Sequence, residues 1–107
     1  MRVCLYARVA CYDQLALDCQ SERLKIFAKE HNLDVVDVAA ECSSGIRADR
    51  PKLSRVEALA ADGKIDAVVA TDISRLFRDA FLYFDFVKRM ESCGVKIFSL
   101  DRLQRLL

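Results

Sequence analysis

The stretch Val3-Cys4-Leu5-Tyr6-Ala7 decides the fold, because it places five apolar residues in a row close to the start of the chain. A continuous apolar run of this length, bounded by Arg2 and Arg8, is typical of a strand that is buried on both faces of a parallel sheet. Comparable β-branched or apolar runs predict three more strands, at residues 35–39, 65–70 and 95–100.

Amphipathic segments separate the predicted strands. Residues 17–31 carry apolar side chains at helical spacing, and Asn32 ends this predicted helix. Further helices are predicted from Pro51, which suits a first helical turn, to Gly63, over residues 79–92 before Gly94 and, as a start only, over residues 101–107. The alternation of strands and helices predicts an α/β fold of three layers (α/β/α), with a mainly parallel central sheet of four or five strands.

Composition limits the classes of function. The 107 residues suffice for one domain, and 53% of them are hydrophobic. The net charge of +1, from 17 basic and 16 acidic residues, is too balanced for a free-standing, non-specific nucleic-acid binder. We therefore expect any DNA contact to be local, or to be shared with a part of the protein outside these residues. No signal peptide and no membrane-length apolar stretch occurs. The five cysteines are odd in number and lack C-x-x-C spacing, so we expect no zinc site, no disulfide framework and a reducing, cytoplasmic location.

Five of the eleven arginines fall on the predicted connections that follow the strands. In an open parallel sheet, ligands bind outside the carboxyl ends of the strands. Arginine suits phosphate there, because its planar guanidinium group offers parallel donors and stays charged when it is desolvated. These residues are Arg8 at the end of the first strand, Arg47 and Arg50 on the loop that starts at Cys42, and Arg75 and Arg78 on the loop over residues 71–78.

The spacing of these arginines allows two interpretations. If the loop over residues 71–78 is helical, Arg75 and Arg78 project to one side, and we expect them to converge with Arg8 on one sulfate-sized site. Alternatively, the arginines are solvated loop charges that pair with the nearby Asp49, Asp72 and Asp79.

Three polar residues, Gln14, Asp18 and Gln20, follow the first predicted loop. They are either site residues or polar caps of the first helix. The only histidine, His31, stands at the end of that helix, where a cation is favourable, so we do not expect it to act as a catalytic base.

The chain also carries candidate hydroxyl and thiol nucleophiles. Ser43, Ser44 and Ser74 are candidate nucleophiles, although loop serines usually serve as caps or turn residues. The segment from Cys42 to Arg47 has a cysteine, a glycine and an arginine spaced much as in the active-site loop of rhodanese-type sulfurtransferases, which suggests a thiol enzyme at Cys42 as a remote alternative. In those enzymes the helix starts at the end of the loop, whereas here Pro51 marks the helix start four residues later.

Several short motifs appear in a specific order. They are Tyr6-Ala7-Arg8-Val9, Asp13-Gln14, Leu17-Asp18 with Gln20, Ser44-Gly45, Asp49-Arg50-Pro51, and Ser74-Arg75-Leu76 with Arg78. This ordered set resembles the N-terminal catalytic domain of the serine recombinases, the family of resolvases, invertases and the larger transposon and phage integrases. The resemblance extends from residue 1 to about residue 100.

The resemblance implies a chemistry and a set of partners. In that family a serine just after the first strand attacks a DNA phosphodiester, which gives a 5′-phosphoseryl link and a free 3′-hydroxyl. Subunits of a tetramer then rotate and the link is reversed, without metal or cofactor. The implied partners are a double-stranded DNA recombination site and, in the full-length protein, further copies of the chain as a homodimer or tetramer.

The resemblance also assigns roles to residues. Arg8, Arg50, Arg75 and Arg78 match the arginines that surround the scissile phosphate, where they would stabilise the charge of the transition state. Gln20 matches a glutamine in the site. Ser74 stands where resolvases often have aspartate and large members often have serine, and Arg47 remains without a role.

One position departs from the family pattern, because Ala10 stands where the nucleophilic serine is expected. A methyl group cannot attack phosphorus, so we expect the chain to hold a phosphate without cleaving DNA. Three explanations stay open: a natural loss in a decayed mobile element, an introduced change that trapped an inactive form, or substitution by the neighbouring Cys11 or Tyr12. The main alternative function is a non-catalytic DNA-binding or assembly module.

The resemblance further implies what would follow residue 107. In the family, a long helix after the fourth strand builds the dimer, and a helix-turn-helix or larger part then reads the DNA sequence. We therefore expect the chain to be truncated before the dimerisation helix and the DNA-binding region, which would supply most phosphate contacts and explain the balanced charge.

Overall fold

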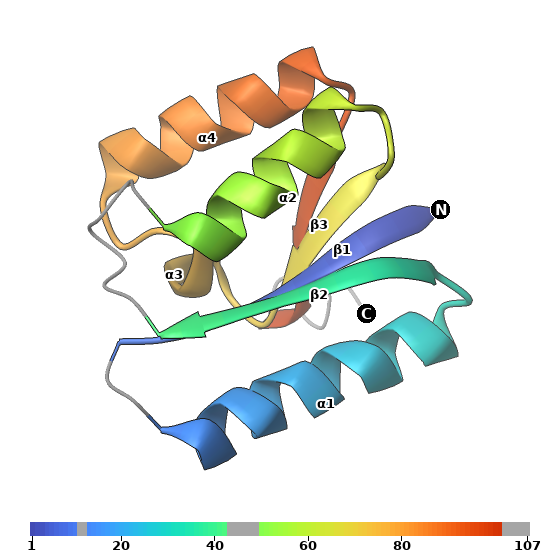
Figure 1. The fold of residues 1–107 in the computed structure, drawn as a ribbon, viewed down its shortest axis with the longest axis vertical. Coiled ribbons are helices and arrows are strands. Elements are labelled where there is room, and N and C mark those ends of the chain that lie inside the picture. The colour runs from blue at the N-terminus through green and yellow to red at the C-terminus, as the bar shows by residue number, and fades with distance from the viewer. Residues whose placement is uncertain (11–12, 43–49, 102–107) are drawn as a thin grey trace.

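The structure is a computed structural model, and it describes residues 1–10, 13–42 and 50–101 (Figure 1). The chain alternates strands and helices as the apolar pattern predicts. Its elements are β1 (Arg2–Val9), α1 (Gln14–Glu30), β2 (Asp34–Cys42), α2 (Pro51–Ala61), β3 (Ala67–Ala70), α3 (Ile73–Leu76), α4 (Ala80–Ser92) and β4 (Lys96–Ser99).

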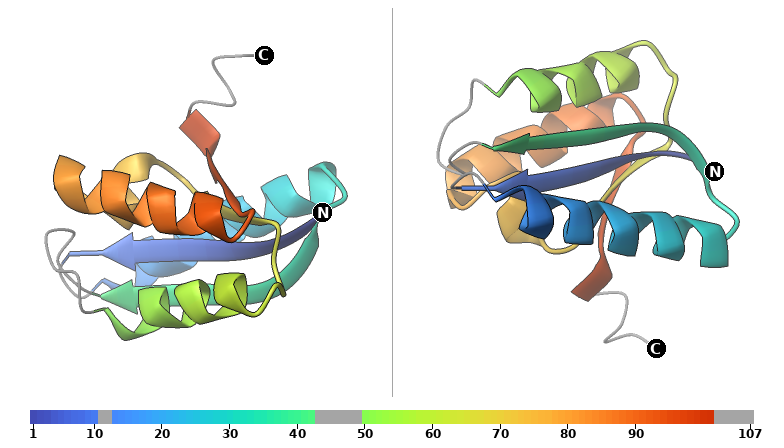
Figure 2. Two further views of the ribbon diagram at one scale, coloured as in Figure 1. Left: turned by 90° about the horizontal axis from the view of Figure 1, so that it is seen from above. Right: turned by 60° about the horizontal axis from the view of Figure 1, so that its bottom comes forward.

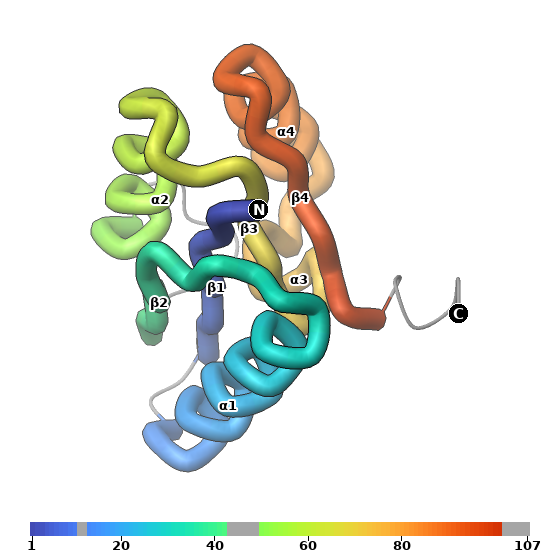
Figure 3. Tube along the Cα trace, turned by 90° about the vertical axis from the view of Figure 1, so that its right-hand side faces the viewer, coloured from blue at the N-terminus to red at the C-terminus, as the bar shows by residue number. Residues whose placement is uncertain are grey.

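The described strands form one parallel sheet in the order β2-β1-β3-β4. Helix α1 covers one face of the sheet, and α2 and α4 cover the other (Figures 2 and 3). This arrangement confirms the predicted three-layer α/β fold. Between β1 and β2 the register shifts by one residue, because Val3 pairs with Val35 and Cys4 with Asp37, which leaves Val36 without a partner on β1.

Strand β1 is apolar throughout because it is covered on both sides. Leu5 and Ala7 belong to the core cluster that contains Leu24 of α1, whereas Cys4 and Tyr6 belong to the cluster beneath α2 and α4. Alternation along the strand therefore places the next even-numbered residue, Arg8, on the α2 and α4 side of the sheet. Burial raises the pKa of the Cys4 thiol to about 12.

The order of the strands creates a switch point beside β1. The chain leaves β1 through α1 to reach β2 on one side, then returns through α2 to β3 on the other side. The connections that follow β1 and β3 therefore diverge, and in open α/β sheets the ligand site lies where neighbouring connections diverge in this way. Arg8 near the end of β1 and α3 directly after β3 both lie at this point.

Some predicted boundaries are wrong. Strand β1 continues to Val9, so Arg8 lies inside the strand instead of closing it, and β2 includes Cys42, which was predicted to begin the following loop. The predicted loop over residues 71–78 contains the one-turn helix α3. The predicted helix stops are confirmed, since Asn32, Gly63 and Gly94 all adopt positive φ.

The predicted loop at residues 43–49 and the helix start at residues 102–107 lie outside the described residues. In the part of the chain that the structure describes, no helix is long and apolar enough to cross a membrane.

Candidate active site

The side chain of Arg8 lies under α3 and is only 2% exposed. Its Nε donates to the carbonyl oxygen of Arg75 at 2.8 Å, and Nη2 donates to that of Ser74 at 2.6 Å. The last carbonyls of any helix lack partners within the helix, and a helix of four residues satisfies almost none internally. Arg8 supplies the missing donors, which ties the end of β1 to α3.

Gln20 holds the main chain of Arg8 from the other face of the sheet. Its side-chain oxygen accepts from the Arg8 amide at 3.2 Å, and its Nε2 donates to the Arg8 carbonyl at 3.0 Å. Arg75 Nη1 donates to the same carbonyl at 3.3 Å. The interpretation of Gln20 as a helix cap is therefore wrong, because the cap of α1 is Asp13, whose carboxylate accepts from Ala16 N.

Arg50 lies directly before α2, and its side chain has no exposed surface. Its guanidinium carbon lies 4.5 Å from the ring centroid of Phe77 and 5.6 Å from that of Tyr6. Nη2 donates to the carbonyl oxygen of Leu76, and Nε lies 3.7 Å from Oε2 of Glu41. Among the described residues, Nε and Nη1 have no hydrogen-bond partner, and the two aromatic faces offset part of their lost hydration.

The sequence interpretation missed Glu41, and it treated Tyr6 only as part of a motif and of the strand. The Tyr6 hydroxyl donates to the Glu41 carboxylate, and burial, followed by this hydrogen bond, raises the Tyr6 pKa. Oε1 of Glu41 also accepts from the backbone amide of Lys52 at 3.2 Å, in the first turn of α2. The available signal was a carboxylate just past the end of a predicted strand, and the register of the sheet places Glu41 opposite Arg8.

Arg75 and Arg78 are the accessible arginines of the site. The Arg75 side chain is 36% exposed, and its Nε lies 3.5 Å from Oδ2 of Asp72. Ser74 Oγ donates to Oδ1 of the same carboxylate. Arg78 is exposed and lies beyond α3, because the helix ends at Leu76 and Phe77 is extended. The two arginines therefore do not share one helix, and the expected pairing of Arg75 with Asp72 does occur.

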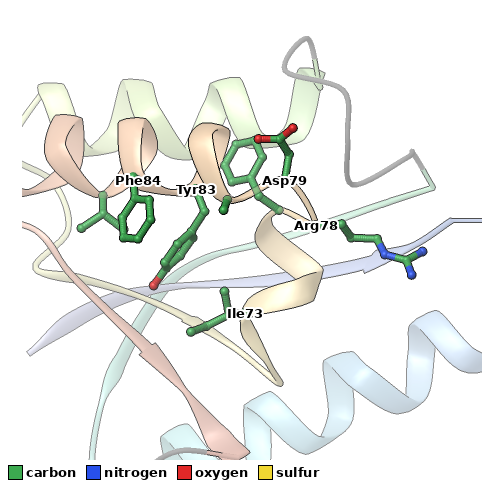
Figure 4. A pocket seen from close by; sticks show the side chains of 8 residues that line it. Ile73, Arg78, Asp79, Tyr83 and Phe84 are labelled. Atoms are coloured by element: carbon green, nitrogen blue, oxygen red, sulfur yellow. The ribbon is translucent and has the colours of Figure 1, made fainter.

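A hollow of about 530 Å³ lies between α3 and the first turns of α4, lined mainly by apolar side chains such as Ile73, Tyr83 and Phe84. Arg78 is at its rim, and Figure 4 shows the Arg78 side chain pointing away from the hollow, toward the end of β1. Asp79 accepts from the backbone amides of Phe81 and Leu82 at the start of α4.

We call Arg8, Arg50, Arg75 and Arg78 the arginine cluster. The pKa of Arg8 is lowered, first by burial and then by the positive charges of Arg50, Arg75 and Arg78. These charges are therefore close enough to repel one another. The Ser74 and Arg75 carbonyls that accept from Arg8 carry no net charge, and the four arginines concentrate positive charge, so the cluster can stabilise an anion at the switch point.

The remaining candidates fall into three groups. Ala10 is exposed and follows β1 directly. Gln14 and Asp18 form a 2.9 Å hydrogen bond on the surface of α1, and His31 caps the far end of that helix with its ring 4.3 Å from the Phe27 ring. The candidates that lie outside the described residues are Cys11, Tyr12, Ser43, Ser44 and Arg47.

Comparisons with known proteins agree with this geometry. The sequence profile of the family described as "Resolvase, N terminal domain" matches residues 3–105. No curated protein sequence matches the chain.

Solved structures give the same result. The C-terminal catalytic domain of ISC1926 TnpA, an IS607-like serine recombinase, is 29% identical with a TM-score of 0.88, over 94% of this chain and 70% of that one. The corresponding domain of IS1535 TnpA is 32% identical with a TM-score of 0.76, over 91% and 69%. The N-terminal catalytic domain of TP901-1 integrase, at 23% identity, shares the fold with a TM-score of 0.87, over 95% and 78%. These matches give no support to a thiol enzyme at Cys42.

Proposed function

Because the chain belongs to the resolvase family of serine recombinases, we propose that the accessible side of its arginine cluster, Arg75 and Arg78 with Arg8 behind them, holds a phosphate of a double-stranded DNA recombination site. The observation that carries this proposal is the position of the cluster. Arg8, Arg75 and Arg78 lie at the carboxyl ends of β1 and β3. The positive charges of Arg75 and Arg78 are close enough to lower the pKa of Arg8. A phosphate anion placed there would relieve the mutual repulsion of the guanidinium groups.

We propose further that this chain does not cut DNA through residue 10. In the family reaction, a serine oxygen forms a bond to phosphorus, the bond from phosphorus to the 3′-oxygen breaks, and the 3′-oxygen takes up a proton. Ala10 is exposed directly after β1, where the family pattern has the attacking serine. Its methyl group has no lone pair and no proton to give up, so the phosphate would be held without being cleaved.

We also propose where in the cell the protein acts. We place the protein in the cytoplasm as part of a mobile element, where it would act on DNA as a dimer or tetramer. The four described cysteines, Cys4, Cys19, Cys42 and Cys93, are free thiols, which fits a reducing compartment.

The test uses the protein from its complete reading frame and a nicked suicide duplex taken from the DNA that flanks its gene. The Ala10→Ser variant should form a covalent protein–DNA adduct through a 5′-phosphate, whereas the Ala10 protein should form none. Adding Arg75→Gln to Ala10→Ser should lower the rate of adduct formation by about 100-fold or more, because one charged donor to the transition state is lost.

The alternative function is a non-catalytic DNA-binding or assembly module, which Ala10 itself favours. It would be supported if Ala10→Ser bound the duplex but formed no adduct. An adduct in the Ala10 protein, mapped by mass spectrometry to Cys11 or Tyr12, would instead show that a neighbouring residue replaces the serine.

A further inference from the structure

Arg8 and Arg50 are the buried members of the arginine cluster, and Arg50 is enclosed more completely than Arg8. Its side chain has no exposed surface, because it is enclosed by the rings of Phe77 and Tyr6, the Leu76 carbonyl and the Glu41 carboxylate. A phosphate oxygen must come within about 3 Å of a guanidinium nitrogen to accept a hydrogen bond. Arg50 therefore cannot contact a phosphate in this conformation, even though it carries a charge.

The contacts that Arg50 does make lead to α3. Arg50 donates to the carbonyl of Leu76, and Arg8 donates to the carbonyls of Ser74 and Arg75. Three successive carbonyls at the end of α3 are thus held by two guanidinium groups, one from β1 and one from the start of α2. A helix of four residues has no stability of its own. Its position depends on these donors.

The position of α3 in turn determines where the accessible arginines lie. Arg75 is inside the held segment, and Arg78 follows Leu76 by two residues. We propose that Arg50 is a positioning residue, which fixes α3 through the Leu76 carbonyl so that Arg75 and Arg78 face the DNA phosphate, and that it is not itself a phosphate ligand. The orientation of Arg75 and Arg78 toward a phosphate and the exclusion of Arg50 as its ligand rest on the proposed function, whereas the fixing of α3 by Arg50 does not.

The chemistry of the contact requires arginine. The guanidinium carbon of Arg50 lies over the Phe77 ring while Nη2 donates to the Leu76 carbonyl and Nε stays near Glu41. The ammonium group of lysine is a compact, strongly hydrated charge, and it cannot stack and donate in this way. Arg50→Lys should therefore keep the charge and lose the position of α3.

The test is arginine modification with phenylglyoxal, followed by mass-spectrometric mapping on the purified chain without DNA. In the native chain Arg78 should be modified readily, and Arg8 and Arg50 should be protected. In Arg50→Lys the modification rate of Arg8 should rise about tenfold, because loss of a charged hydrogen bond to α3 exposes Arg8 by local opening. The matched control is Arg55→Lys, in the same helix, where a half-exposed arginine pairs with Asp37 at 2.7 Å. This control should leave Arg8 protected.

Two results would overturn the positioning role. One is modification of Arg50 in the native chain at the rate of Arg78, and the other is unchanged protection of Arg8 in Arg50→Lys. Hydrogen exchange of the β1 and β3 amides shows whether Arg50→Lys is still folded. If it is not, Phe77→Leu serves instead, since it removes the ring beneath Arg50 and keeps every arginine, and it should raise Arg8 modification several-fold.

A second measurement separates positioning from phosphate contact. In the protein from the complete reading frame, Arg78→Gln should reduce the slope of log K against log salt by about 0.9, the value for one phosphate contact. Arg50→Gln should weaken DNA binding and leave the slope unchanged, and a reduced slope would show that Arg50 is a phosphate ligand after all. Absence of any DNA binding would contradict the proposed function alone, because the modification experiment contains no DNA.

Discussion

Arg2 and Arg8 lie at opposite ends of β1, and they use their charges in opposite ways. Arg2 is about half exposed and pairs with a carboxylate, with Nη2 3.1 Å from Oδ1 of Asp66 and its backbone amide 2.7 Å from Oδ2. This hydrogen bonding raises the pKa of Arg2. Arg8 is buried and pairs with neutral carbonyls, and its pKa is lowered by burial and by neighbouring arginines.

The difference lies in what each partner does to the charge. At the amino end of β1, the Asp66 carboxylate offsets the charge of the Arg2 guanidinium group. A carbonyl satisfies the hydrogen-bonding capacity of arginine and leaves its positive charge in place. The carboxyl end of the sheet is therefore held together by the same donors that make it attractive to phosphate.

Replacing Arg8 should cost the most stability. Arg8→Met keeps the volume of the side chain and leaves the Ser74 and Arg75 carbonyls without donors, so we expect the free energy of unfolding to fall by about 3 kcal/mol. For a chain of this size, that corresponds to a fall in Tm of more than about 10 °C. Arg2→Met, measured by the same thermal melt, should cause a much smaller change. Equal effects of the two substitutions would remove the contrast between the ends of β1.

Replacing Gln20 should have the next largest effect. Gln20→Leu removes two hydrogen bonds to the main chain of Arg8 at a buried position, with an expected loss of about 2 kcal/mol in urea unfolding. Gln14→Leu on the exposed surface of the same helix should change the midpoint little. If both variants unfold at the same urea concentration, Gln20 does not anchor the end of β1.

Sulfate should stabilise the native chain through the carboxyl end of the sheet. At a sulfate concentration ten times its Kd, the expected gain is about 1.4 kcal/mol relative to sodium chloride of equal ionic strength. The double variant Arg75→Gln with Arg78→Gln should lose this gain, whereas Arg23→Gln on exposed α1 should retain it. A gain of equal size in the double variant would place the anion elsewhere.

The amino end of the sheet should respond to acid. The hydrogen bonds from Arg2 lower the pKa of Asp66 to about 2 from an ordinary value of 3.8. Because the folded-state pKa is depressed, the ionised carboxylate contributes stability above about pH 4, and this contribution is lost as the pH falls toward 2. Asp66→Asn should flatten this part of the pH profile of Tm. Its effect at pH 7 should be the smallest of the four, since the pair is exposed to solvent.

The sequence predicts the layers of this molecule better than it predicts the contacts of the site. The apolar run at residues 3–7 and the stops at Asn32, Gly63 and Gly94 are local signals, and each indicates its element correctly. The residues that hold Arg8 and Arg50 come from segments that are far apart in the chain. Gln20 of α1 binds the Arg8 main chain from the face of the sheet opposite the Arg8 side chain. Glu41 accepts from Tyr6 only because the register of β2 places it beside Arg8 and Tyr6.

Helix α3 could not be predicted from the sequence either. Four residues, Ile73–Leu76, carry too little helical pattern to be distinguished from a loop, and their conformation is stabilised by side chains of β1 and α2. The arginines could be predicted as a group from the rule for parallel sheets. Which of them are buried could not be predicted, because arginine burial depends on aromatic neighbours that only the fold brings together.

The register shift between β1 and β2 has a consequence for the behaviour of the protein at high concentration. Strand β2 is at the edge of the sheet, and its Val35 and Val36 are more than 40% exposed, which would make a regular edge a template for strand addition by another copy. The extra residue at Val36 interrupts the spacing of free backbone groups and increases the local twist. An incoming strand therefore meets an interrupted ladder beside the exposed valines, and this end of the edge is a poorer template for strand addition by another copy.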